Sequence, residues 1–68
     1  MILKDFISAC DENLMVVLWD AKSEQFIGEY YQVDHVGQDL VDHYATWKVV
    51  KIQGSGKGYL IDILLEEV

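Results

Sequence analysis

Hydrophobic residues near the N-terminus recur at the spacing of one helical face. Leu3, Phe6, Ile7 and Cys10 occupy positions i, i+3, i+4 and i+7 of such a face. Asp, Glu and Asn follow directly, and these residue types favour turns because their side chains compete for backbone hydrogen bonds. The pattern therefore predicts a short helix over residues 2–10 that packs one face against the rest of the chain.

Two strands are predicted next. Residues 14–19 are all apolar, so both faces of this strand are apolar, which is typical of a central strand or of one that presents a face to a partner. A polar loop over residues 20–25 follows. Residues 26–33 are predicted to form the second strand, in which Gly28 indicates a bulge or a close approach by another segment.

The second half of the chain repeats this order of elements. Val36, Leu40 and Tyr44 stand at helical intervals, but Gly37 limits any helix within residues 34–45 to one or two turns. A hairpin is predicted after it. Its strands are residues 46–53, rich in β-branched and aromatic side chains, and residues 59–65, which alternate; three glycines lie in the loop at 54–58.

These elements predict a single α+β domain over residues 1–68, in the order α-β-β-α-β-β, with a four-stranded, mostly antiparallel sheet. A domain of this length has a small core. Cys10 is the one cysteine, which excludes an intramolecular disulfide and a thiolate zinc cluster and favours a reducing compartment. With no signal peptide and no apolar run long enough to span a bilayer, we expect a cytoplasmic protein without membrane contact.

Charge is the most informative part of the composition. The net charge is −7, and residues 11–42 hold eight acids against Lys22 alone, so the whole excess lies in this window. The chain has no arginine, the side chain best suited to gripping phosphate or reading guanine. Direct binding to nucleic acid is therefore disfavoured, and a protein partner with a basic surface is expected.

Several segments together resemble a known group of proteins. They are residues 3–7 (LKDFI), 16–20 (VVLWD), 26–30 (FIGEY), 47–50 (WKVV) and 59–63 (YLIDI). This pattern is similar to the small acidic proteins of bacteriophages and other mobile elements of bacteria. Those with assigned roles commonly inhibit host defence nucleases, including restriction enzymes and CRISPR effectors, and several present carboxylates as DNA does. The resemblance implies an anti-restriction or anti-CRISPR inhibitor that acts in the host cytoplasm.

The acidic window and its tyrosines supply the candidate partner-binding residues. Same-face residues on a strand lie about 6.6 Å apart, near the separation of successive phosphates along one DNA strand. Acids around the second strand are therefore expected to imitate part of a DNA backbone. Tyr30 and Tyr31 are adjacent and must point to opposite faces, so one of them lies outside the core. The predicted partner-binding residues are Asp20, Glu24, Glu29, Tyr31, Asp34, Asp39 and Asp42.

The alternative function is that of a structural or assembly protein. In that case an exposed strand edge and the aromatic residues would form a homodimer or larger oligomer, and the charge would serve solubility alone. We expect no enzyme activity and no cofactor. His35, Asp39 and His43 are four residues apart and would share a helical face as metal ligands, but Gly37 interrupts the segment and a solvated helix edge is the favoured interpretation. The loop at 54–58 does not match a phosphate-binding loop, because Gly58 follows Lys57 where such a loop has Ser or Thr, and a strand follows where it has a helix.

Overall fold

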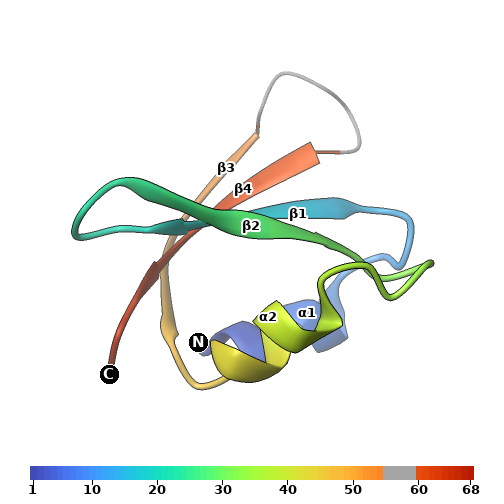
Figure 1. The fold of residues 1–68 in the computed structure, drawn as a ribbon, viewed down its shortest axis with the longest axis horizontal. Helices are drawn as coiled ribbons and strands as arrows, with labels where there is room; N and C mark the ends of the chain where they lie inside the picture. Colours follow the sequence, from blue (N-terminus) through green and yellow to red (C-terminus); the bar gives the residue numbers. More distant parts are fainter. Residues whose placement is uncertain (55–59) are drawn as a thin grey trace.

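The computed structural model describes residues 1–54 and 60–68 and shows two layers, a four-stranded sheet with both helices on one of its faces (Figure 1). The predicted α+β class and the order α-β-β-α-β-β are confirmed. Each helix precedes a pair of strands, as the hydrophobic pattern indicated. The elements are α1 (Leu3–Ala9), β1 (Met15–Asp20), β2 (Gln25–Tyr31), α2 (Gln38–His43), β3 (Lys48–Gly54) and β4 (Leu60–Glu66).

The sheet has the strand order β2-β1-β4-β3 and is mixed. β2 pairs with β1 and β3 with β4 in antiparallel fashion, whereas β1 and β4 pair in parallel at the centre. Parallel neighbours need a crossover connection. Here the segment that contains α2 carries the chain from β2, at one edge, to β3, at the other. Residues 14–19 were expected to form a central strand or one that presents a face to a partner; β1, at Met15–Asp20, is a central strand, because it has a neighbour on each side.

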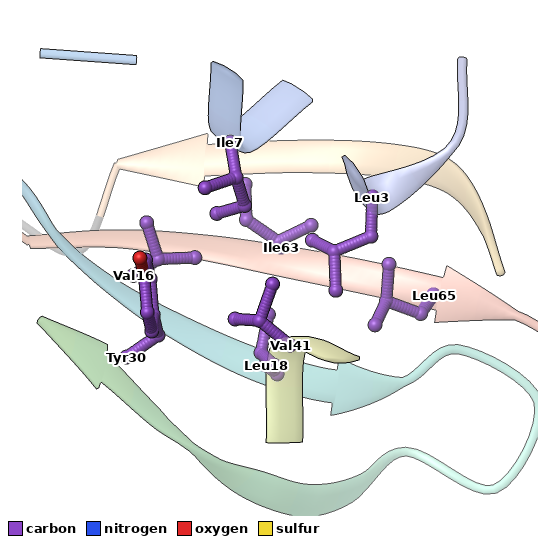
Figure 2. Packing of buried hydrophobic residues seen from close by; sticks show 8 residues of the cluster. All are labelled: Leu3, Ile7, Val16, Leu18, Tyr30, Val41, Ile63 and Leu65. Carbon is purple, nitrogen blue, oxygen red and sulfur yellow. The ribbon is translucent and has the colours of Figure 1, made fainter. Parts of the chain in front are cut away.

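The hydrophobic core lies between the helices and the sheet (Figure 2). Residues of alternating position on the strands contribute one face, and the apolar side of each helix covers it. Leu3, Leu18, Ile63 and Leu65 are completely inaccessible to solvent. The core residues are Leu3, Ile7, Val16, Leu18, Tyr30, Val41, Ile63 and Leu65.

The N-terminal segment is tied to the start of β3. The Leu3 amide donates to the Trp47 carbonyl at 2.9 Å, the Lys4 amide donates to Ala45 at 2.9 Å, and the Val49 amide donates to the Met1 carbonyl at 2.8 Å. The first two bonds satisfy amides of the first turn of α1, which have no partners within a helix. The three bonds together cover the first part of the outer edge of β3.

The turn after β2 differs from the prediction. Residues 26–33 were expected to form the strand, but β2 ends at Tyr31, where the Tyr31 and Val36 backbones exchange hydrogen bonds of 2.9 and 3.1 Å. Gly37 then adopts φ 82°, a left-handed conformation that glycine tolerates, and α2 starts behind it. Gly37 therefore precedes the helix and does not interrupt it.

Gly28 is a site of close approach, as predicted. A Cβ atom at this position would overlap the side chain of Leu40, so the missing side chain lets α2 pack directly on β2. In the terminal hairpin the strands are Lys48–Gly54 and Leu60–Glu66. The loop prediction for residues 54–58 falls mainly outside the described residues, as does Tyr59.

Candidate protein-interaction surface

The face of the sheet opposite the helices has no described element over it (Figure 1). We call this surface the open face. Strand register and burial assign side chains to it, because paired residues on neighbouring strands share a face and successive residues alternate. The open face consists of Phe26, Glu29 and Tyr31 on β2, Met15, Val17 and Trp19 on β1, Leu60, Asp62 and Leu64 on β4, and Lys51 and Gln53 on β3.

An aromatic pair lies on the open face. Phe26 is 56% exposed, and its ring packs edge-on against that of Trp19, with 5.6 Å between centroids. A bulge produces this pair. Leu18 pairs with Gly28 and Trp19 with Phe26, so Ile27 is the extra residue, and Phe26 moves to the face opposite the core. Exposed Trp and Phe side chains are typical anchors of protein interfaces.

A cavity of about 240 Å³ opens beside Trp19. Its wall combines apolar groups with two carboxylates. Trp19 Nε1 donates a long hydrogen bond of 3.4 Å to Asp62 Oδ1, which connects β1 to β4 across the face. The cavity is lined by Trp19, Glu24, Gln53, Asp62 and Leu64.

The turn from β1 to β2 positions Glu24 at the rim of this cavity. Asp20 Oδ1 accepts hydrogen bonds from the amides of Lys22, at 2.9 Å, and Ser23, at 3.2 Å, and the Glu24 amide donates to the Asp20 carbonyl at 2.7 Å. Asp is suited to this role because its short side chain bonds to the backbone two or three residues ahead. Asp20 therefore shapes the turn, whereas the exposed Glu24 remains available to a partner.

A band of carboxylates follows the β2 side of the molecule. We call it the acidic edge: Glu24, Glu29, Asp34, Asp39 and Asp42, all exposed. Glu29 belongs to the open face and the last two to α2, which packs beneath β2. Within residues 1–54 and 60–68 these five carboxylates make no ion pair. Lys48 and Lys51 lie on β3 at the far edge of the sheet, whereas Lys22 lies in the β1–β2 turn, two residues before Glu24.

The structure separates the predicted partner-binding residues into distinct places. Asp20 ends β1, and Glu24, Glu29 and Tyr31 belong to the open face or its rim. Asp34 lies in the loop between β2 and α2, and Asp39 and Asp42 lie in the helix layer. Glu29 and Tyr31 are the two that lie within β2. The expected even spacing of acids along one strand is therefore absent, and the acids lie instead on the turn before β2, on β2, in the loop after it and on α2.

Some residues of this surface escaped the sequence-based prediction. Trp19, Phe26, Asp62 and Leu64 were not among the predicted partner-binding residues, although they form the aromatic pair and the cavity wall. One indication was available. The run over residues 14–19 is apolar on both faces, and a strand with one face in the core must present the other to solvent or to a partner.

The histidine cluster is not assembled. His35 lies in the loop before Gly37 with φ 55°, whereas Asp39 and His43 are on α2. Over the part of the chain that the structure describes, no three His, Cys, Asp or Glu side chains are grouped to hold a metal ion. Cys10 is half-buried at the end of α1, and this burial raises the pKa of its thiol, which keeps it protonated.

Tyr30 makes the fold sensitive to high pH. Its hydroxyl donates to Gln38 Oε1 at 3.1 Å, and Gln38 Nε2 donates to Asp42 Oδ1 at 3.0 Å. Burial, and then the negative charge of Asp42, raise the pKa of Tyr30 above its ordinary value of 10.0. The unfolded chain therefore loses this proton first, and the stability that Tyr30 contributes is present below pH 10.0 and lost as pH rises through the folded-state pKa.

We expect urea denaturation between about pH 8 and pH 11 to show a fall in unfolding free energy above the ordinary tyrosine pKa. Tyr30→Phe removes the ionisable group and is expected to flatten that fall, at the cost of the bond to Gln38. An equally steep fall in Tyr30→Phe would show that other groups cause the pH dependence.

The two helices of the described residues, with seven and six residues, are too short to cross a membrane.

Comparison of the chain with known proteins finds no matching family model, no matching curated protein and no matching solved structure.

Proposed function

We propose that this protein is a small acidic protein-binding module that inhibits a nucleic-acid-handling host defence enzyme, of the anti-restriction or anti-CRISPR kind, by occupying its basic surface. The acidic edge is the observation that carries the proposal. Its five exposed carboxylates have no described cation within ion-pair distance, so their charge is available to a partner. Such a band suits a basic channel that otherwise holds nucleic acid.

The distribution of charge supports this interpretation. Five exposed carboxylates lie on β2, α2 and the loops beside them, where Lys22 is the one described lysine, whereas Lys48 and Lys51 lie on β3 at the opposite edge of the sheet. A localised field of one sign steers a partner of the opposite sign and raises the association rate, an effect that salt reduces. The acidic edge would therefore approach the enzyme first, in the place of DNA or RNA.

Charge reversal tests the proposal. We expect the wild-type protein to inhibit DNA cleavage by at least one member of a panel of restriction and CRISPR nucleases, and Glu29→Lys, Asp34→Lys and Asp39→Lys combined to raise the half-inhibitory concentration by about tenfold or more. Each exposed charge contact contributes about 0.2–1 kcal/mol, and three reversals also introduce repulsion.

The control carries the same change of net charge away from the acidic edge. Glu12, Glu66 and Glu67 are exposed and lie outside it, so their combined replacement by lysine is expected to alter inhibition less than threefold. Equal losses of inhibition in the two triple variants would show that net charge causes the effect, and not the position of the acids. Absence of inhibition across the whole panel would exclude this class of partner.

A second candidate function is assembly of a homo-oligomer. It is favoured by β3, an edge strand whose Val50 and Ile52 are 41% and 52% exposed beside a hollow lined also by Met1 and Val49. Lys51 lies on the same strand, and lysine on an edge strand opposes strand pairing between copies. Light scattering over a range of protein concentrations distinguishes the two functions, because an assembly protein would grow in mass as concentration rises.

A further inference from the structure

We infer that the open face docks a basic segment of the partner protein, and that an arginine or lysine side chain of this segment enters the cavity beside Trp19. The inference rests on the proposed function and gives it an anchor. The acidic edge accounts for attraction at long range. The cavity accounts for where one cationic side chain is held.

The cavity has the chemistry of a site for a cationic side chain with an apolar stem. Glu24 and Asp62 each offer a carboxylate, and charge-assisted hydrogen bonds to carboxylates are the strongest that a guanidinium or ammonium group makes. Asp62 uses Oδ1 to accept from Trp19 Nε1, which leaves Oδ2 for a ligand. Trp19 lines the cavity with an aromatic side chain, a type of group that attracts cations, and Leu64 offers an apolar wall for the stem.

The size of the cavity also favours a single side chain. Its volume of about 240 Å³ is below the roughly 300–1,000 Å³ typical of pockets for drug-sized ligands and cofactors. The exposed ring of Phe26 and the side chains of Met15 and Tyr31 extend the apolar surface beyond it along β1 and β2. The residues on either side of the cationic residue in the partner segment therefore have an apolar surface to pack against.

The charge of the open face selects a cationic partner over a second copy of this chain. Glu24, Glu29 and Asp62 lie on it or at its rim, and Lys51 is the described cation that the register assigns to it. A face-to-face dimer would cover the Glu29 and Asp62 carboxylates of both copies in one interface. Burying like charges together is costly, whereas a cation from another protein neutralises Asp62.

A peptide pair tests the site without the partner enzyme. The probes are N-acetyl-Val-Arg-Val-amide and the same peptide with citrulline, which has nearly the shape of arginine without its charge. We expect the arginine peptide to shift the Trp19 indole N–H resonance in a saturable way, identified by its absence from Trp19→Phe. The citrulline peptide is expected to bind at least about tenfold more weakly.

Matched variants assign the binding to the cavity. Asp62→Asn keeps an oxygen for the Trp19 bond and loses the charge, and Glu24→Gln removes the charge at the rim. Each is expected to weaken binding of the arginine peptide about tenfold. Glu12→Gln removes one charge from an exposed turn and is expected to change the affinity less than twofold. An unchanged amide spectrum elsewhere shows that each variant is folded.

Three outcomes overturn the inference. They are equal binding of the arginine and citrulline peptides, no effect of Asp62→Asn, or open-face resonances that shift with protein concentration alone, which would assign this face to a second copy. None of them decides the proposed function. If charge reversal at the acidic edge still abolishes nuclease inhibition while the peptides fail, the module binds its enzyme without this anchor.

Discussion

Leu18→Ala is expected to lower the free energy of unfolding by about 2–5 kcal/mol. Leu18 is fully buried in the central strand β1, where it contacts the core beneath the helices (Figure 2). A chain of 68 residues has a stability of roughly 3–10 kcal/mol in total. The loss is therefore a large part of that total. Urea denaturation followed by circular dichroism measures it as a shift of the unfolding midpoint to a lower urea concentration.

Leu64→Ala is the matched control for this substitution. Leu64 lies on β4, next to β1 in the same sheet, but on the open face, where it is half-buried. Part of its surface is already in contact with water, so we expect a loss of about 1 kcal/mol or less. If Leu64→Ala were as costly as Leu18→Ala, the open face would have to be covered in solution, which would favour self-association.

The elements themselves were predictable because their patterns are local. Leu3 and Ile7 mark the buried side of α1 by helical spacing, and both are in the core. Tyr30 and Tyr31 were expected on opposite faces, and Tyr30 is 3% exposed in the core while Tyr31 is on the open face. The period of 3.6 or 2 residues is set by backbone geometry, so it is legible in the chain before any tertiary contact is known.

The arrangement of the strands was not predictable in the same way. Two hairpins were expected, but the parallel pairing of β1 with β4 depends on which hairpin edges meet, and that is decided by packing under both helices. The bulge at Ile27 is a second case. A regular strand would put Phe26 on the side of Gly28 and Tyr30, facing the core, whereas the extra residue moves it to the open face.

The candidate site was missed for a related reason. Asp62 and Trp19 are 43 residues apart in sequence and meet because β4 lies beside β1. The acids of the predicted partner surface are close in sequence, so the sequence alone was enough to group them. The cavity could not be predicted in this way, because its walls come from β1, β4, β3 and the turn before β2, which are distant in sequence.

Gly37→Ala is expected to destabilise the protein by more than about 2 kcal/mol. Gly37 has φ 82°, a conformation that costs a residue with a Cβ about 1–2 kcal/mol. A Cβ there would also overlap the carbonyl oxygen of Glu29, and this oxygen belongs to the backbone, so no side-chain rotation can relieve the overlap. α2 would have to shift away from β2. Gly54→Ala is the control: a Cβ at this position meets no atom within 4 Å, so the change in unfolding free energy is expected to stay within about 1 kcal/mol in either direction. Thermal and urea denaturation of both variants measure the difference, and equal stabilities would contradict the left-handed turn between β2 and α2.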